Sequence, residues 1–187
     1  MHIFTKMAKK SIFKSIEIPE GVEVTVDKAK VTVKSGDKKN EREFDLMNLT
    51  LEKKGNEIIV GNKKSSKNEK KMTNTIASHI KNMIKGVKEK YEYKLKVCFN
   101  HFPMTVEVKG NEAIIKNFLG ERSPRKVKIP TGAEVKVDKE IITVTSSDKE
   151  IAGQAAANFE MVTRIVNRDR RIFQDGIFIT NKCGVEM

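Results

Sequence analysis

The side chains best suited to bind a ligand are lysines and arginines that gather in three segments of the sequence. The first segment includes Lys63 and Lys64, the second contains Lys116, Arg122, Arg125 and Lys126, and the third contains Arg164, Arg168, Arg170 and Arg171. Arginine grips a phosphate through two parallel N–H donors, whereas lysine acts as a mobile point charge. These residue types predict a phosphate-rich partner, with the sharper contacts in the second half of the chain.

Two of these segments also have a purely structural interpretation. The lysines from Lys63 to Lys71 precede and begin an expected helix, where the helix dipole disfavours cations unless an anion binds there, but a solvated loop is equally compatible. The arginines from Arg164 to Arg171 follow a second expected helix, where cations stabilise the C-terminal end. The residue types alone leave these alternatives open.

The overall charge points to a polyanionic partner as well. Lys and Arg number 37 against 25 Asp and Glu, which gives a net charge of +12 and a pI near 9.6. Such an excess favours nucleic acid or an anionic membrane surface, although a lysine-rich surface on an ordinary soluble protein gives the same sum. No apolar run approaches the roughly 18 residues of a spanning helix, so no membrane partner is expected.

The sequence lacks the motifs that would indicate catalysis or a cofactor. No phosphate-binding glycine loop, nucleophile elbow or zinc-protease motif occurs, and neither Cys98 nor Cys183 has the neighbours of a metal site. Cys98 lies near His101, but its apolar neighbours indicate a core or edge cysteine. Asp27 and Asp138 fit hairpin turns better than a carboxylate pair. We therefore expect a non-enzyme without metal, cofactor or small-molecule substrate.

An internal repeat specifies the elements that would hold the basic residues. Residues 18–38 and 129–149 align without a gap at an offset of 111, and thirteen of these 21 positions are identical. Apolar residues alternate with polar ones on both sides of a short polar turn in each copy, which predicts a β-hairpin. The chain is therefore a tandem duplication.

A helix is expected after the hairpin in each copy. Ser66 with Glu69, and Ser147 with Glu150, have the spacing of a capping box at a helix start. The apolar residues that follow share one helical face in each copy: Ile76, Ile80, Met83, Ile84 and Val87 in the first, and Ile151, Ala155, Phe159, Val162 and Val166 in the second. The two helices align at an offset near 82, which predicts about 29 extra residues, forming another hairpin over 41–62, in the first copy.

These elements predict an α+β fold in which each repeat is a small, antiparallel-rich β-sheet packed with one α-helix. The expected boundaries are a basic N-terminal arm over 1–14, a first repeat over 15–90, a second repeat over 91–180 and a C-terminal tail over 181–187. An organellar transit peptide is the alternative interpretation of the arm.

Several motifs resemble the large-subunit ribosomal protein six family, which is called number nine in eukaryotes. They are His101-Phe102-Pro103, residues 116–122 (KNFLGER), residues 167–171 (NRDRR), residues 78–87 (SHIKNMIKGV) and residues 174–179 (QDGIFI). The likeness extends from about Ile16 to Ile179, and Glu121-Arg122-x-Pro124-Arg125 is most similar to the archaeal branch, with the eukaryotic cytosolic branch second.

The resemblance implies a duplicated α+β protein of the cytoplasmic ribosome. It also implies binding to large-subunit ribosomal RNA near the sarcin–ricin loop and the stalk base, beside neighbouring ribosomal proteins and docking translation factors. Two other classes remain as alternatives: a protein–protein adaptor, which predicts an exposed apolar patch, and an RNA-modifying enzyme, which predicts a cleft with clustered titratable groups.

Overall fold

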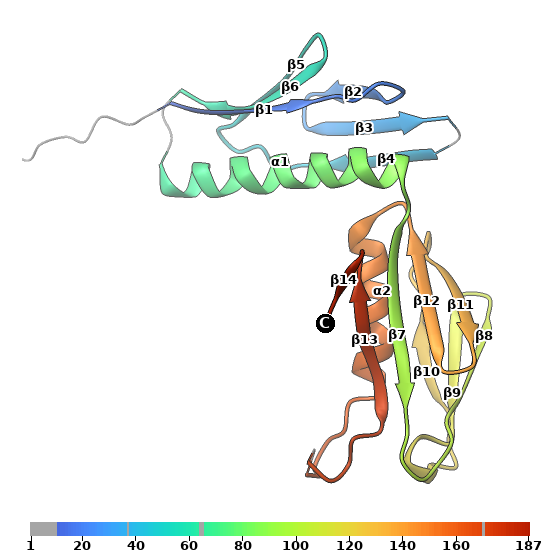
Figure 1. The fold of residues 1–187 in the computed structure, drawn as a ribbon. Helices are drawn as coiled ribbons and strands as arrows, with labels where there is room; N and C mark the ends of the chain where they lie inside the picture. The colour runs from blue at the N-terminus through green and yellow to red at the C-terminus, as the bar shows by residue number, and fades with distance from the viewer. Residues whose placement is uncertain (1–10, 37, 64–65, 170) are drawn as a thin grey trace, which may run out of the picture. The chain divides into compact units, whose positions relative to one another are not determined.

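The structure, a computed structural model, describes residues 11–36, 38–63, 66–169 and 171–187. The chain divides into two compact units, Met1–Lys88 and Glu89–Met187 (Figure 1). Each unit contains one long helix and two antiparallel sheets. The chain is thus an α+β tandem duplication, as the repeat predicts.

The first unit consists of six strands followed by a helix. Its elements are β1 (Ile12–Glu17), β2 (Glu23–Asp27), β3 (Lys30–Ser35), β4 (Lys38–Glu43), β5 (Thr50–Lys54), β6 (Glu57–Asn62) and α1 (Lys67–Lys88). The strands form two three-stranded sheets, in the orders β1-β6-β5 and β2-β3-β4. The expected hairpin over 41–62 is present as β5 and β6, and α1 packs against β1, β3 and β6.

The second unit has the same two sheets with additions at its C-terminal end. Its elements are β7 (Tyr91–Cys98), β8 (Thr105–Lys109), β9 (Glu112–Lys116), the 3-10 turn η1 (Phe118–Gly120), β10 (Arg125–Lys128), β11 (Glu134–Asp138), β12 (Ile141–Ser146), α2 (Lys149–Val162), β13 (Gly176–Lys182) and β14 (Val185–Glu186). Three strands pair as β10-β9-β8 and five as β11-β12-β7-β13-β14.

The strand pairing shows that the two units use the same strands in a rotated order. The β5–β6 turn at Gly55 and the β8–β9 turn at Gly110 both have φ 60, and residues 52–62 match residues 107–117 at seven of eleven positions. Strand β6 pairs with β1 as β9 pairs with β10. The last three strands of the first unit, β4, β5 and β6, therefore correspond to the first three strands of the second unit, β7, β8 and β9.

This correspondence corrects the expectation of 29 extra residues in the first copy. Nothing is inserted there, because the matching strands stand before the repeated hairpin in the second unit. Two backbone hydrogen bonds between the strands recur at corresponding positions of the two units. Ile18 N donates to Asn56 O as Ile129 N donates to Asn111 O (both 2.8 Å), and Phe44 N donates to Ala29 O (2.9 Å) as Val97 N donates to Glu140 O (2.7 Å).

Each unit has its own hydrophobic core between helix and sheets. The first core includes Val31, Val33, Ile58, Val60 and the predicted face of α1, all buried. The second is centred on fully buried Phe118, Phe159, Leu95, Ile115 and Ile177. Among the residues described, no helix combines the length and apolar character needed to cross a bilayer.

The second helix differs from its prediction at both ends. It begins one residue later than the capping box implies, because Asp148 is the N-cap and its carboxylate accepts the Glu150 N–H at 2.8 Å. It ends at Val162, with Thr163 as C-cap, so the predicted helical position of Val166 is wrong and that side chain is exposed. Val166 lies in the loop, and it continues the helical spacing of the apolar residues from Ile151 to Val162 only by chance.

Both predicted chain-end boundaries also change. Residues 12–14, expected in the basic arm, form the start of β1 and pair with β6, while residues 1–10 lie outside the described part of the chain. Residues 181–187, expected as a tail, contain the end of β13 and the short strand β14, which pair at Asn181 with Glu186 and at Lys182 with Val185. Strand β14 has no buried residue, so no alternation of apolar and polar positions marks it in the sequence.

Candidate nucleic-acid interface

The end of helix α2 is where the second and third basic segments meet. Arg125, the first residue of β10, donates from Nη1 to the carbonyl of Val162 at 2.5 Å, so it satisfies a carbonyl of the last helical turn. Its Nε and Nη2 form a paired contact with Glu121 at 2.8 and 2.6 Å. Its guanidinium also lies 4.2 Å from the centre of the Phe118 ring.

Arg125 therefore acts as a structural link in this chain. Three of its donors are used within the protein and one face of its guanidinium rests on an aromatic ring. Glu121 has a lowered pKa, first because of its hydrogen bond with Arg125 and further through the charges of Arg125 and Arg168. The charges of both arginines therefore act on the Glu121 carboxylate, and we treat Arg125 and Arg168 as members of one charged cluster.

The loop that supports Arg125 has an unusual backbone. Asn117, Leu119 and Gly120 all have positive φ, at 61, 49 and 76 degrees. The turn buries Phe118 and exposes the neighbouring Arg122. A Cβ on Gly120 would lie 3.2 Å from the Phe102 ring, so glycine is needed there for both space and conformation. The loop therefore presents Arg122 from a firmly anchored turn.

The third basic segment lies beyond the helix, in the loop from 163 to 175. Arg164 is exposed two residues past Val162, and the Arg168 guanidinium stacks 4.9 Å from the centre of the Phe173 ring. Arg171 pairs with Asp169 through Nη2 at 2.8 Å. The last turn of α2 contains no basic residue. The interpretation of these arginines as helix-dipole partners is therefore wrong, and Arg125 occupies that position from another strand.

Lys116 and Lys126 belong to the same unit and lie on the same outward face of the β10-β9-β8 sheet. Lys116 ends β9 and pairs with Glu107 at 2.6 Å, while Lys126 lies on β10 between inward-facing Arg125 and Val127, so it points out of the β10-β9-β8 sheet. The structure thus separates Lys126 from its sequence neighbour Arg125. The strand β10 was missed in the sequence because only Val127 within it is buried.

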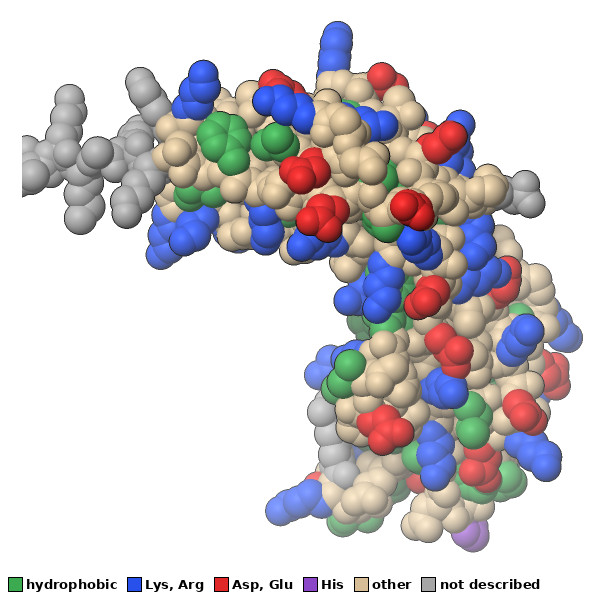
Figure 2. Space-filling model, turned by 45° about the horizontal axis from the view of Figure 1, so that its top comes forward, with side chains coloured by type: hydrophobic (Ala, Val, Ile, Leu, Met, Phe, Trp, Pro, Cys, Tyr) green, Lys and Arg blue, Asp and Glu red, His purple; other side chains and the backbone are tan. Residues whose placement is uncertain are grey.

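Lys63 lies in the first unit, exposed just after β6. Lys64 and Arg170 lie outside the described residues. Figure 2 shows Lys and Arg side chains interleaved with Asp and Glu over the face that it draws, so the positive charge is not gathered on that face. Within the residues described, Arg125 joins two arginine-bearing segments at the end of α2, and the cluster consists of Arg122, Arg125, Arg164 and Arg168.

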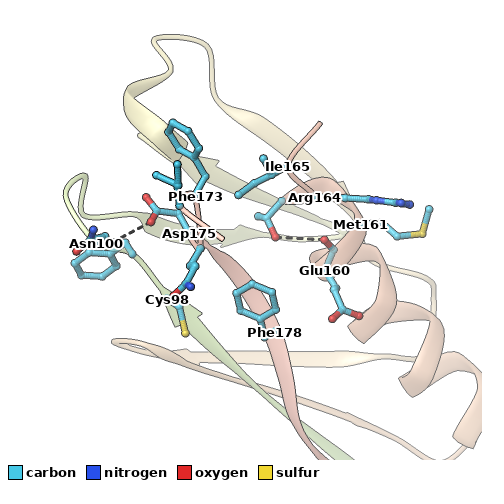
Figure 3. A pocket seen from close by; sticks show the side chains of 13 residues that line it. Cys98, Asn100, Glu160, Met161, Arg164, Ile165, Phe173, Asp175 and Phe178 are labelled. Carbon is cyan, nitrogen blue, oxygen red and sulfur yellow. Dashed lines mark hydrogen bonds between the residues drawn. The ribbon is translucent and has the colours of Figure 1, made fainter. Parts of the chain in front are cut away.

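A groove borders this cluster that the sequence did not reveal. Its volume is about 900 Å³, and it lies between the ends of β7 and α2, the loop 163–175 and β13 (Figure 3). Arg164 stands on its edge, and Asp175 and three phenylalanines line it. The only available signal was the run of unburied apolar residues Val166, Ile172 and Phe173 among the arginines. No group of three His, Cys, Asp or Glu within the described residues could hold a metal ion.

Comparison with known proteins identifies the family. The family model for ribosomal protein L6 matches residues 16–90 and again residues 102–176. The chain belongs to the ribosomal protein L6 family. The chain is 46% identical over 173 residues to the large ribosomal subunit protein uL6 of Methanococcus vannielii, which covers 92% of the chain and 95% of that protein.

Two further relatives agree with this assignment. The uL6 protein of Methanobrevibacter smithii is 42% identical over 172 residues (92% of the chain, 97% of that protein), and that of Methanosarcina mazei is 44% identical over 174 (93% and 99%). As a member of the ribosomal protein L6 family, of the archaeal type, the chain is a structural protein of the cytoplasmic ribosome and not an enzyme.

Proposed function

We propose that this L6-family chain is built into the large ribosomal subunit and binds its ribosomal RNA through the arginine cluster at the end of α2. The location near the sarcin–ricin loop and the stalk base follows from the family resemblance, and with it neighbouring ribosomal proteins and nearby translation factors. The observation that supports the RNA contact is the hydrogen bond from Arg125 to Val162 O, because it joins the loop that bears Arg122 to the helix end that precedes Arg164 and Arg168.

The cluster fits phosphate recognition for two reasons. Arg125 ties the loop from 117 to 125 to the last turn of α2, so the exposed arginines on either side start from a braced backbone. Preordered side chains lose less conformational freedom on binding, which raises affinity. The ring beneath Arg125, Phe118, is fully buried, so the arginines around it offer phosphate contacts, which favours recognition of folded RNA by shape and phosphate position.

The test is the salt dependence of RNA binding. The full chain is titrated with a large-subunit ribosomal RNA fragment that contains the sarcin–ricin loop, at several salt concentrations. About six phosphate contacts predict a slope of log K against log salt of roughly −4 to −5. The double variant Arg164→Gln with Arg168→Gln should reduce the slope by about 1 to 2, because up to two contacts are lost.

The matched control is Lys63→Gln with Lys67→Gln, which removes the same charge from the first unit. We expect a smaller loss of slope and affinity from this pair. A slope near zero for the unmodified chain would rule out phosphate recognition as the mechanism. Equal losses from both double variants would refute the assignment of the principal contact to the second unit.

A further inference from the structure

The groove beside α2 has the chemistry of a small binding site. Its volume of about 900 Å³ falls in the range of pockets that hold small ligands. Phe99, Phe173 and Phe178 all line it, and Figure 3 shows the Phe173 and Phe178 side chains coming from the loop and from β13. Flat aromatic walls suit a flat ligand.

The apolar lining of this groove is accessible. Met161 is 67% exposed, Ile172 is 72% exposed and Phe178 is 43% exposed. A group of large, exposed apolar side chains around a cavity is typical of a surface that a ligand or partner covers. The arginines of the same loop add positive charge nearby: Arg164 lines the groove, and Arg168 stacks on the ring of Phe173.

Asp175 gives the groove a specific polar group. Only 6% of Asp175 is exposed, and one carboxylate oxygen, Oδ1, accepts the backbone N–H of Asn100 at 3.1 Å (Figure 3). A carboxylate has about four acceptor positions, so most of its capacity remains for donors that enter the groove. A buried carboxylate that faces a cavity favours a ligand with N–H groups.

We infer that this groove receives one unstacked nucleobase of the bound RNA, with guanine preferred. The inference rests on the proposed RNA binding and adds a base contact to the phosphate contacts. The base would lie against the phenylalanine rings, as single-stranded bases stack on aromatic side chains. Guanine presents two adjacent N–H donors to one carboxylate, whereas uracil presents a single N–H. Its phosphates would lie toward Arg164.

An apolar side chain of a neighbouring protein fits the groove less well. It would match Met161 and Ile172, but it would cover Asp175 without offering a donor, and a carboxylate that loses water without a new partner is costly. A nucleobase satisfies both the rings and the carboxylate. The arginines on the border complement a nucleotide's phosphate as well.

The experiment is a titration of the full chain with each of the four ribonucleoside 5′-monophosphates at millimolar concentrations, followed by methyl NMR. We expect guanosine monophosphate to shift the methyl signals of Ile172 and Met161 and to bind about tenfold more tightly than uridine monophosphate. Asp175→Asn should remove that preference. Phe178→Ala should weaken binding of all four nucleotides.

Matched variants separate binding from folding. Ile172→Ala should weaken nucleotide binding, whereas Ile141→Ala, at a half-exposed isoleucine on β12, should not; Phe13→Ala in the first unit is the control for Phe178→Ala. Equal shifts with all four nucleotides, or none, would overturn the inference. A second result would also overturn it: an apolar dye binds the unmodified chain, its binding is lost in Phe178→Ala, and no nucleotide binds. The groove would then suit a protein partner.

The same variants distinguish this inference from the proposed function. If the unmodified chain binds the ribosomal RNA fragment with a steep salt slope but no nucleotide shifts the groove signals, only the nucleobase inference fails. If the salt slope is near zero, the proposed phosphate recognition fails, whatever the nucleotides do.

Discussion

The two units have one scaffold but carry their positive charge in different ways. Residues 1–88 contain 20 Lys and Arg against 11 Asp and Glu, whereas residues 89–187 contain 17 against 14. The first unit thus holds +9 of the net +12, and the second only +3. Six of the seven arginines lie in the second unit, however, and four of them, Arg164, Arg168, Arg170 and Arg171, follow α2 in the sequence.

The difference shows that the net charge of a unit does not determine where its candidate binding site lies. A lysine excess spread over a surface attracts a polyanion from a distance and gives little orientation. The second unit has the arginines, the internal link at Arg125, the groove and the added strands β13 and β14. We therefore propose that the first unit attracts the RNA and that the second unit positions it.

The structural origin of the difference is one position in the rotated repeat. Asn62 and Asn117 correspond at the end of β6 and β9, and the next residues are Lys63 and Phe118. Lys63 is exposed and leads to the lysine-rich loop, whereas Phe118 is buried and anchors the turn beneath Arg125. The same strand end is thus followed by an exposed lysine in one unit and by a buried phenylalanine that anchors a turn in the other.

The largest expected effect comes from removing that anchor. Phe118→Ala should lower the free energy of unfolding of the second unit by about 3–5 kcal/mol, because it deletes a fully buried ring and leaves a cavity. Native-state hydrogen exchange of the β9 and β10 amides measures the loss. Lys63→Ala, at the corresponding exposed position, should change the first unit by no more than about 0.5 kcal/mol. Comparable losses in both units would break the comparison.

A smaller effect is expected at a hydrogen bond that both units share. Ser146 Oγ donates to Gly132 O at 2.8 Å, and Ser35 Oγ donates to Gly21 O at 2.9 Å. Ser146 is buried and also accepts the Asp148 N–H that leads into α2, so Ser146→Ala should cost about 1–3 kcal/mol. Ser35 is more exposed, and water can replace its hydroxyl in Ser35→Ala.

Denaturant unfolding of both serine variants, with hydrogen exchange to assign each transition to its unit, checks this ranking. If Ser35→Ala lowers the free energy of unfolding as much as Ser146→Ala does, the repeated hydrogen bond contributes equally to the two units. Burial of Ser146 would then add less stability than we infer.

Most of the fold was predictable from the sequence, because it rests on alternation and repetition. The hairpin at Val22–Val33 and its copy, the helical faces and the strands on both sides of Gly110 all follow from local patterns. The rotated strand order does not follow from the hairpin and helix alignments, which run in one linear order, although residues 52–62 and 107–117 carry its signal.

The candidate site was only partly predictable. Residue type identified the arginines, but their roles depend on contacts over long sequence separations, as between Arg125 and Val162. The strand β10 turns Arg125 inward and Lys126 outward, which a list of basic residues cannot show. The groove is formed by the ends of four segments, and the buried Asp175 within it has no periodic signal.

The smallest expected effect concerns the charge pair that holds Arg125. Glu121 has its pKa lowered from 4.5, chiefly by the hydrogen bond with Arg125, so its ionised form stabilises the fold. Because the folded-state pKa is depressed, this stabilisation is present above pH about 4.5 and is lost as the pH falls through the folded value. The side chain is 39% exposed, so solvent screening limits the contribution to about 1 kcal/mol at most.

Glu121→Gln should therefore lower the unfolding midpoint of the second unit at pH 7 and leave little difference from the unmodified chain near pH 3. The comparison in the first unit is Glu41, whose pKa is lowered by hydrogen bonds with Lys30 and Lys39. Its lysine partners lie at exposed positions and have no planar, two-donor contact, so Glu41→Gln should give a smaller pH-dependent gap. A gap at Glu41 that equals the gap at Glu121 would show that the Glu121 contact adds nothing beyond ordinary surface pairing, and the link at Arg125 would then depend on its contacts with Val162 and Phe118.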